Sequence, residues 1–376
     1  MKIVEICPYD LTRPGGVQNH VLDLAAWLEQ AGHQVRIVAP LPVAGTGLGH
    51  VDHIGGGRGF SLFGTGFELT YARPGARRRL VAELRDWGAE LVHLHTPWTP
   101  LMAWQVWRGL RLPTVTTFHA TLPADKTTGA GGRALAGAAR YFLKRSLAAI
   151  VPSVSPLAHL RPEATGTPAH VLPPTIDLSS WRQAGEAASA APDAREGLEI
   201  VFLGRFEERK GLDVLLSAWP VLAEAVKGAR LTVAGGGKLE PLVHRAMAGP
   251  GGDRIRLVPV PDAAMARELV ARADLLAAPS PYGESFGLVL IEAMAAGTLP
   301  LAAANEGYAT VMTGPGARLL VPPGDAAALA ALAIDLARKP EERARLRTWA
   351  EGHAASFDVA RAGPAFVEVF QAALGR

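Results

Sequence analysis

Residues 281–298 read PYGESFGLVLIEAMAAGT, an apolar run that carries two glutamates, Glu284 and Glu292. The run lies between two shorter apolar stretches, 274–280 and 298–304, and this order predicts a strand, a helix and a parallel strand. The glutamates are eight positions apart, which is little more than two helical turns. Because carboxylates are rarely buried without a partner, each glutamate is expected to contact a cation or a bound ligand.

Length and composition indicate an ordered protein of two domains. The chain has 376 residues, of which 49% are hydrophobic, so sizeable cores are expected and wholesale disorder is not. The net charge of +3 is no reason to expect a nucleic-acid partner. The single cysteine, Cys7, permits no disulfide framework, which is typical of a reducing cytosol, and it is expected to be buried. No stretch predicts a membrane span, and the run before Pro8 is too short for a signal peptide.

The amino-terminal half alternates strands and helices with the spacing of a parallel sheet. Segment 2–7 is predicted as a buried strand, 17–33 as a helix that ends at Gly32, and 34–40 as the next strand. Further strands are predicted at 90–95, 113–118, 147–151 and 169–172. The glycine-rich segment 42–68 is interpreted as loops with short strands.

A second alternation follows the segment 173–197, whose proline, alanine, serine and glycine content indicates an interdomain link. Strands are predicted at 198–204, 229–235, 254–260, 274–280 and 298–304, and helices at 211–227, 238–248, 263–273, 286–296, 325–338, 340–355 and 358–374. The predicted fold class is α/β, with two Rossmann-like, doubly wound domains that face each other across a cleft. The domains are placed at 1–174 and 175–357, and the last helix, 358–374, is expected to pack back onto the first.

Loops after predicted strands are the expected ligand sites, because open parallel sheets bind ligands beyond the carboxyl ends of their strands. Gly15 and Gly16 precede a helix, where backbone N–H groups can approach an anion, although a plain tight turn explains them equally well. His119 directly follows an apolar strand and is interpreted as facing a ligand rather than as structural. Arg205 and Lys210, between a strand end and a helix start, are expected to converge on a diphosphate.

The charged residues between those two cations, Glu207, Glu208 and Arg209, are interpreted as a solvated turn. Neither an Asp-x-Asp motif nor a cluster of histidines with acidic residues is apparent, so the sequence predicts no metal.

The helix inside the opening stretch is predicted to start at an anion. Ser285 is the expected N-cap, and the N–H groups of Phe286, Gly287 and Leu288 would then face a phosphate.

The two glutamates are expected to bind hydroxyl groups. Glu284 would accept hydrogen bonds from a sugar, and Glu292 from a ribose diol. The alternative is an ion pair between either carboxylate and a basic residue such as Lys210, and the two arrangements are compatible.

Segment 71–90, YARPGARRRLVAELRDWGAE, has an apolar helical face and many arginines. The face comprises Leu80, Val81, Leu84 and Trp87, and the basic residues comprise Arg73, Arg77, Arg78, Arg79 and Arg85. A helix of this kind over 74–88 can lie on an anionic bilayer. Packing of its apolar face into the core of the domain is nearly as good an interpretation.

Arg205 and Lys210 followed by Glu284-x7-Glu292 resemble the signature of retaining, sugar-nucleotide-dependent glycosyltransferases of family four, which have the two-domain GT-B fold. The segments PYDLTRPGGVQNHVLDLA, TTFHAT and GESFGLVLIEAMAAGT resemble bacterial phosphatidylinositol mannosyltransferases most closely. The resemblance covers nearly the whole chain in the same order. The chain departs from it at Trp98, where the related enzymes have a polar residue, and at PPTID (173–177), where the family commonly has Pro-Asn-Gly-Val-Asp.

The resemblance implies a role for each matching residue. The first domain would bind the acceptor and the second the nucleotide sugar. The catalytic set implied is His119, Arg205, Lys210 and Glu284. The donor set is Gly15, Gly16, Arg205, Lys210, Glu284, Ser285, Phe286, Gly287 and Glu292, and the acceptor set is Tyr9, Gln18, Arg77, Arg78 and Arg79. In particular, His119 would lie near the sugar 6-hydroxyl, and Tyr9 and Gln18 near a polar headgroup.

The function implied is retaining transfer of a hexose, with mannose favoured, from a nucleotide diphosphate sugar to a membrane lipid such as a phosphatidylinositol-like precursor. GDP-mannose is the favoured co-substrate, and no cofactor is implied. The enzyme would be cytoplasmic and peripheral on the inner face of the cell membrane, with its oligomeric state left open. Two alternatives are a soluble sugar or polyol acceptor, and a non-catalytic, membrane-associated protein that binds sugar nucleotides.

Overall fold

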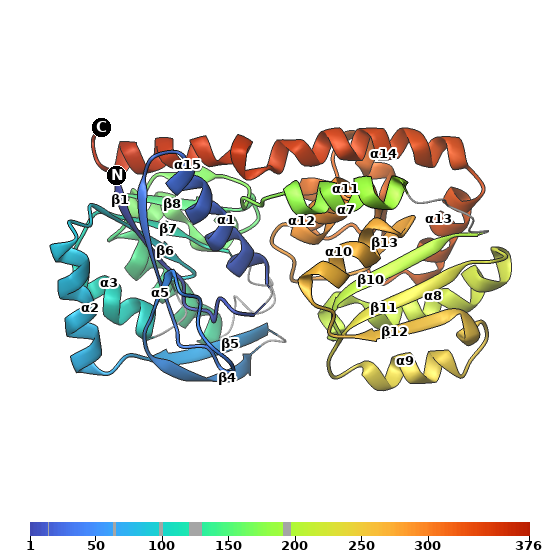
Figure 1. Cartoon of the computed structure of the whole chain (residues 1–376), viewed down its shortest axis with the longest axis horizontal. Coiled ribbons are helices and arrows are strands. Elements are labelled where there is room, and N and C mark those ends of the chain that lie inside the picture. The colour runs from blue at the N-terminus through green and yellow to red at the C-terminus, as the bar shows by residue number, and fades with distance from the viewer. Residues whose placement is uncertain (14, 63–64, 98–100, 120–129, 191–196) are drawn as a thin grey trace. The chain divides into compact units, whose positions relative to one another are not determined.

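The computed structural model describes residues 1–13, 15–62, 65–97, 101–119, 130–190 and 197–376. This part of the chain forms two compact units (Figure 1). Unit 1 comprises Met1–Ile176 together with Val359–Arg376, and unit 2 comprises Asp177–Asp358. The chain passes from one unit to the other between Ile176 and Asp177, two residues beyond the expected boundary, and the last helix belongs to unit 1.

Unit 1 is built on a parallel sheet, in which its described residues form seven strands in the spatial order β3-β2-β1-β6-β7-β8-β9. These strands are β1 (Lys2–Ile6), β2 (Gln34–Ala39), β3 (Val51–His53), β6 (Leu91–His95), β7 (Thr114–Thr117), β8 (Ala148–Val151) and β9 (Ala169–Val171). The order reverses at β1, which pairs with β2 on one side and with β6 on the other. The predicted doubly wound sheet is confirmed, and the reversal makes the carboxyl end of β1 the expected place for a ligand.

A hairpin stands beside this sheet. Strands β4 (Gly56–Leu62) and β5 (Thr65–Tyr71) pair antiparallel along seven residues each. Segment 42–68 therefore contains strands, as expected, but the sequence did not predict that two of them pair with each other. Close strand pairing explains one of the glycines, since a Cβ on Gly57 would lie 2.3 Å from the carbonyl oxygen of Leu69.

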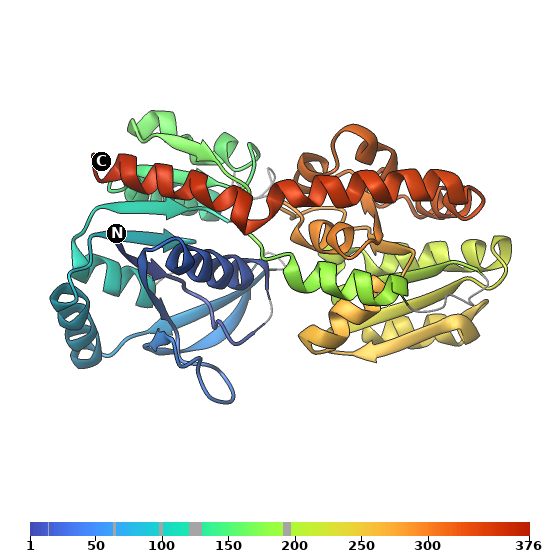
Figure 2. The same ribbon diagram turned by 45° about the horizontal axis from the view of Figure 1, so that its top comes forward.

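Helices cover both faces of the sheet of unit 1. Helices α1 (Gly16–Gln30) and α15 (Val359–Ala373) pack together over one face (Figures 1 and 2). The other face is covered by α2 (Pro74–Asp86), α3 (Met102–Leu110) and α5 (Ala130–Leu143), and a short helix, α6 (Leu157–Leu160), follows β8. The alternation of side chains along each strand separates the two layers. Ile3 and Leu91 contact the α1–α15 layer, whereas Val4 and Val92 contact the opposite one.

Unit 2 repeats the same architecture, and its described residues form a parallel sheet of six strands in the order β12-β11-β10-β13-β14-β15. The strands are β10 (Glu199–Arg205), β11 (Arg230–Gly236), β12 (Ile255–Pro259), β13 (Leu275–Ala278), β14 (Leu299–Ala303) and β15 (Leu320–Val321). Its helices are α7 (Ser179–Ala190), α8 (Leu212–Ala225), α9 (Glu240–Met247), α10 (Ala263–Ala271), α11 (Leu288–Ala295), α12 (Glu306–Val311), α13 (Ala326–Ala337) and α14 (Pro340–Ala354). The order reverses at β10, between β11 and β13.

The segment interpreted as an interdomain link contains a helix. Helix α7 occupies Ser179–Ala190, buries Trp181 and packs against α10 and α11 of unit 2. The prediction of a link over 173–197 was wrong for these residues, because their alanines and serines are compatible with a helix once Trp181 has a core to enter.

Two glycines inside helices of unit 2 distinguish the effect of close packing on stability from the effect of helix propensity. In α7, a Cβ on Gly185 would lie 2.7 Å from the carbonyl oxygen of Ala296, whereas a Cβ on Gly352 in α14 would meet no atom within 4 Å. We predict that Gly185→Ala lowers the free energy of unfolding by about 1–3 kcal/mol, because α7 must move away from α11. Gly352→Ala should raise it by about 0.5–1 kcal/mol. Urea unfolding of both variants checks this, and equal effects would contradict the close approach of α7.

Candidate functional site

In unit 2, the charged residues singled out in the sequence lie at the carboxyl ends of the two central strands. Arg205 is the last residue of β10, and Lys210 ends a short 3₁₀ turn (η2, Glu208–Lys210) before α8. Glu284 lies in the loop between β13 and α11. Since β10 and β13 are neighbours at the reversal of strand order, the fold brings these three residues to one edge of the sheet.

One carboxylate oxygen of Glu284 contacts two cationic side chains. Its Oε1 lies 2.7 Å from Lys210 Nζ and 3.3 Å from an Nη of Arg209. Arg209 also donates from Nε to Glu207 at 3.2 Å, and Glu207 pairs with Arg205 at 2.8 Å. The result is a chain of alternating charges that runs from Arg205 to Lys210. Among the described residues, Oε2 of Glu284 has no such partner and is available to a ligand hydroxyl.

The interpretation of Glu207, Glu208 and Arg209 as a solvated turn agrees with the exposed Glu208 but was wrong for Glu207 and Arg209, which form ion pairs. The Arg209 side chain is only 13% exposed and pairs with both Glu207 and Glu284. Sequence reasoning missed Arg209 because all four residues at 207–210 are charged, two acidic and then two basic, which is equally typical of a turn in water. Only the tertiary contact with Glu284, 75 residues away, distinguishes it.

The exposure of these groups differs along the chain of charges. Glu284 is 14% exposed and Lys210 21%, whereas Arg205 at the other end is 52% exposed. The ion pair considered as an alternative for Glu284 is therefore formed. It places the carboxylate beside two cations, and charged groups of this kind form strong hydrogen bonds to anions and hydroxyl groups.

The loop before α11 is closely packed. The N-cap of α11 is Gly287 rather than Ser285, and no side chain caps the helix, so the predicted Ser285 cap was wrong. Gly287 has φ 139°, and a Cβ there would lie 2.8 Å from the Tyr308 ring. The backbone must therefore follow a path that only glycine permits. The Phe286 side chain is buried edge-on against Phe357, with ring centroids 5.6 Å apart, so only its main chain can meet a ligand.

Below this loop, Tyr308 is fully buried. Its hydroxyl lies 3.2 Å from Ser280 Oγ, and its backbone N–H donates to Asn305. Burial, together with the nearby charge of Glu284, raises the pKa of Tyr308 well above its ordinary value, so the phenol is neutral. Glu292, further along α11, is half-buried, with partners of its own.

In unit 1, the glycine loop is in contact with one of the proposed acceptor residues. A Cβ on Gly15 would lie 2.3 Å from Gln18 Oε1, so the Gln18 amide folds over Gly15. Gly16 is the exposed first residue of α1. Asp10 orders the preceding loop by accepting hydrogen bonds from Thr12 and from the N–H of Val43. Tyr9 in this loop is half-buried and packs against the core cluster that contains Cys7, which is itself buried as expected.

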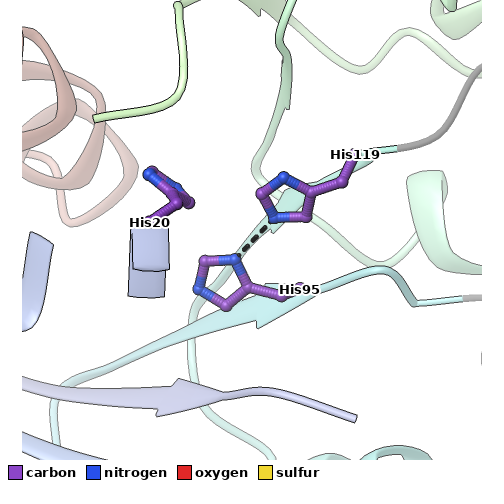
Figure 3. Close-up of side chains that lie close together, drawn as sticks. All are labelled: His20, His95 and His119. Atoms are coloured by element: carbon purple, nitrogen blue, oxygen red, sulfur yellow. Dashed lines mark hydrogen bonds between the residues drawn. The ribbon is translucent and has the colours of Figure 1, made fainter. Parts of the chain in front are cut away.

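His119 belongs to a cluster of histidines and one carboxylate. His95 Nδ1 lies 2.9 Å from His119 Nε2 (Figure 3). On its other side, His95 Nε2 lies 2.6 Å from Glu5 Oε2. His93 Nδ1 lies 2.8 Å from the same oxygen of Glu5. The ring of His20 on α1 meets those of His95 and His119 edge to face, with centroids 5.6 and 5.3 Å apart.

The alternation of the strands explains how this cluster forms. Glu5 pairs with His93 in the register of β1 and β6, and His95 pairs with Thr117 in that of β6 and β7. All four side chains lie on the face covered by α1 and α15, in rows that begin with the apolar residues Ile3, Leu91 and Val115. Toward the carboxyl end of each strand, polar residues follow the apolar ones on this same covered face. The cluster is therefore buried.

Burial and mutual proximity set the charges in the cluster. Desolvation would raise the pKa of Glu5, but the His93 and His95 imidazoles lower it to about 2. Burial and the neighbouring His93 lower the pKa of His95 to about 4, despite its hydrogen bond to Glu5. Burial and the other histidines also hold the pKa values of His20 and His119 well below the ordinary value. At neutral pH these three imidazoles are uncharged.

The sequence expectation that histidines and acidic residues do not cluster was wrong. One nitrogen each from His20, His95 and His119 lie within 4.8 Å of one another, as do ligand atoms of Glu5, His93 and His95. The two histidines of segment 91–95, at alternate positions of a strand beside one carrying Glu5, were the signal that could have revealed it.

The basic helix α2 is anchored by its apolar face. Leu80, Val81 and Leu84 are buried in the core of unit 1, and Trp87 packs against the same cluster. Bilayer contact through this face is therefore excluded, and only the arginines remain for an external partner. Among them, Arg78 and Arg79 are exposed and Arg77 is half-buried. Trp98 lies outside the described residues.

No helix among the described residues combines the length and the apolar character that crossing a membrane requires.

Comparisons with known proteins agree in both halves of the chain. Residues 14–180 match the family model "Glycosyltransferase Family 4", and residues 188–353 match "Glycosyl transferases group 1". The chain is 34% identical to the phosphatidyl-myo-inositol mannosyltransferase of Mycobacterium leprae, over 92% of this chain and 90% of that protein. It is 32% identical to the protein of the same name from Mycolicibacterium smegmatis, over 92% of this chain and 86% of that one.

A solved structure supports the fold. HepE of Anabaena, crystallised with UDP, superposes with a TM-score of 0.74 over 99% of this chain and 100% of its own, at 18% identity.

The lowered histidine pKa values predict that unit 1 loses stability as the pH falls. An unfolded histidine takes up a proton near pH 6.5, whereas native His95 does so only near pH 4. The unfolded chain therefore binds more protons between these values and is favoured, by roughly 2 kcal/mol at pH 5 for His95 alone. Glu5 adds little above pH 5, because it is largely ionised in both states there, and its own loss of stability begins below that pH.

Hydrogen exchange resolves this effect within one sample. Amides of β6 and β7 should lose protection from pH 7 to pH 5, after correction for intrinsic exchange, more than amides of β13 in unit 2. His244→Gln, at a site that is 61% exposed, is the control and should change neither. An equal loss of protection in both units would contradict the prediction.

Proposed function

The chain belongs to the GT-B glycosyltransferases with a family 4 domain followed by a group 1 domain, and on that premise we propose that it transfers mannose from a nucleotide diphosphate sugar to a membrane lipid. The favoured donor is GDP-mannose and the favoured acceptor a phosphatidylinositol-like precursor. No cofactor is required besides the co-substrate. The names of the relatives support the sugar and the acceptor, since two proteins called phosphatidyl-myo-inositol mannosyltransferase align over nine-tenths of this chain.

The observation that carries the donor assignment is the pairing of Glu284 with Lys210 and Arg209 at the carboxyl edge of the sheet of unit 2. A carboxylate between cations suits a substrate that is a polyol at one end and a diphosphate at the other. We assign Lys210, Arg209 and the exposed Arg205 to the diphosphate, and the unpaired oxygen of Glu284 to hydroxyls of the sugar. The main chain of Ser285, Phe286 and Gly287 and the carboxylate of Glu292 complete the donor set.

In unit 1, Gly15 and Gly16 are proposed to approach the donor through their main chain, and His119 to contact the sugar. Tyr9 and Gln18, at the same carboxyl edge of the sheet, are proposed to meet the polar headgroup of the acceptor.

The reaction proposed is a transfer on one face of the sugar. The bond from the anomeric carbon to the diphosphate oxygen breaks as the acceptor hydroxyl forms its bond to the same carbon, with retention. The acceptor proton passes to the departing diphosphate. The protein's contribution is then electrostatic, since its cations stabilise the negative charge that grows on the leaving group.

The acceptor is proposed to be reached at a membrane surface. Arg77, Arg78 and Arg79 lie on α2, whose apolar face is held in the core, so they present charge to anionic lipid without inserting. The enzyme would then be cytoplasmic and peripheral on the inner face of the cell membrane.

Transfer of radiolabel tests the proposal. Purified protein is incubated with GDP- and UDP-sugars and with membranes from its host, and the organic and aqueous phases are counted. Label from GDP-mannose in the organic phase, lost in Glu284→Gln but kept in Glu240→Gln, is expected. Label only in a water-soluble product would replace the lipid with a soluble acceptor. Donor binding without any turnover would leave a sugar-nucleotide-binding protein instead.

Removing one cation should act on the rate. We predict that Lys210→Gln lowers kcat by roughly 10²–10³, the usual effect of deleting one preorganised group that stabilises developing charge. Lys227→Gln is the matched control, because Lys227 is exposed and precedes β11, at the opposite end of the sheet. Steady-state kinetics on both variants test this predicted difference in kcat. A similar loss in the two, or an effect of Lys210→Gln on donor KM alone, would refute the assignment.

A further inference from the structure

The cluster around Glu5 contains a continuous chain of hydrogen bonds. Its hydrogen bonds lead from the fully buried carboxylate through His95 to His119, which is only partly buried. Figure 3 shows the bond between His95 and His119. The Glu5–His95 contact is 2.6 Å and the His95–His119 contact 2.9 Å, both within hydrogen-bonding range. His93 contacts Glu5 from the side, and its other nitrogen pairs with Thr117.

The carboxylate determines where the protons lie. An ionised carboxylate can only accept, so Nε2 of His95 must carry the hydrogen that faces Glu5. A neutral imidazole has one N–H, which leaves Nδ1 of His95 as an acceptor. The nitrogen opposite, Nε2 of His119, must then donate, and Nδ1 of His119 is left without a proton. No described residue occupies that nitrogen.

We propose that Glu5 and His95 are positioning residues that hold His119 in the Nε2–H form, so that its Nδ1 accepts a hydrogen bond from a hydroxyl of the bound sugar. This inference rests on the proposed function, in which His119 meets the donor sugar. It adds two residues, buried beneath the site, that touch no substrate.

A neutral acceptor suits the reaction. As the diphosphate departs, positive charge develops on the sugar ring, and an imidazolium beside it would oppose that charge. Burial and the neighbouring imidazoles hold the pKa of His119 well below its ordinary value, so His119 does not become charged at neutral pH. A carboxylate at the position of His119 could accept the same hydrogen bond, but it would carry a full negative charge.

His20 lies beside the relay. Its Nδ1 accepts the backbone N–H of Thr175 at 2.9 Å, so its hydrogen is on Nε2, which is buried and has no hydrogen-bond partner among the described residues. Its ring stands at 72° to that of His95 and at 64° to that of His119, while those two are stacked at 14°. The ring of His20 thus packs edge to face against both members of the relay.

A metal ion is the competing occupant, because His20, His95 and His119 converge. The proton positions oppose it. Zinc would need a bare nitrogen from each ring at about 2.0–2.1 Å. The Thr175 N–H occupies the bare nitrogen of His20, and the 2.9 Å separation of His95 and His119 is that of a hydrogen bond.

Nitrogen NMR of ¹⁵N-histidine-labelled protein tests the tautomers directly, with His20→Gln, His93→Gln and His119→Gln variants for assignment. In the wild type, Nδ1 of His119 should have the shift of an unprotonated ring nitrogen, and Nε2 that of a protonated one. Glu5→Gln, whose amide can donate to His95, should reverse both rings. Glu5→Asp should keep the wild-type pattern. A protonated Nδ1 on His119 in the wild type would overturn the proposal.

Kinetics test the consequence. Glu5→Gln should lower kcat about ten- to hundredfold, with donor KM changed by less than about twofold, and Glu5→Asp should recover part of the rate. His93→Gln is the control, because it removes a contact of the same carboxylate but lies off the path to His119. It should lower stability and leave kcat within about threefold. Equal losses of kcat in Glu5→Gln and His93→Gln would reduce Glu5 to a structural role and overturn the proposal.

Chelation tests whether a metal ion occupies the cluster, and turnover tests the proposed function. Wild-type protein treated with EDTA should keep its rate and its spectrum, whereas loss of both, restored by one Zn²⁺ per chain, would overturn the relay. If untreated wild type transfers sugar from no donor, the proposed function fails, and the role toward a sugar hydroxyl fails with it. The tautomer spectrum still decides the Glu5–His95–His119 chain, because it requires no turnover.

Discussion

A carboxylate removed from water needs partners, and each unit places one such carboxylate near the carboxyl ends of its central strands. In unit 2, Glu284 takes two cations on one oxygen. In unit 1, Glu5 takes two imidazoles on one oxygen. The partners come from neighbouring strands or from the loops that follow them, because the sheet reverses its order at β1 and at β10 and leaves those positions uncovered by a crossover. The strand order thus determines where each charge can be balanced.

The two carboxylates differ in how freely they can change partners. Glu284 is 14% exposed, and its partner Arg209 also pairs with the more exposed Glu207, so an anionic ligand can take the place of one contact without leaving a charge unpaired. Glu5 is fully buried, and its partners are themselves buried. Its hydrogen bonds are therefore constant, as a group that orients another residue requires. In the proposed function, the Glu284 site exchanges ligands, whereas Glu5 keeps its partners and orients a side chain above it.

Close backbone approach holds the exchangeable site in shape. Gly211, at φ 68° directly after Lys210, would bring a Cβ within 2.1 Å of the Pro279 carbonyl oxygen, and Gly307 would bring one within 2.2 Å of the Glu284 carbonyl oxygen. The loops that carry Lys210 and Glu284 are therefore packed against neighbouring backbone, where any side chain would separate them. The ion pair lies between two rigid loops, so its geometry costs little entropy to maintain.

The sequence by itself determined the fold class, most strand and helix positions, and the Arg205, Lys210 and Glu284 set, because period-2 and period-3.6 patterns and the residues after strands are local properties. It did not determine that Ser179–Ala190 is a helix or that Gly56–Tyr71 is a hairpin, since both depend on surfaces supplied by distant segments. Arg209 and the histidine cluster were decided only by the tertiary structure. Glu5 and His95 are 90 residues apart, and His20 and Thr175 are 155 apart. Such contacts follow from strand order and register, which no stretch of sequence encodes alone.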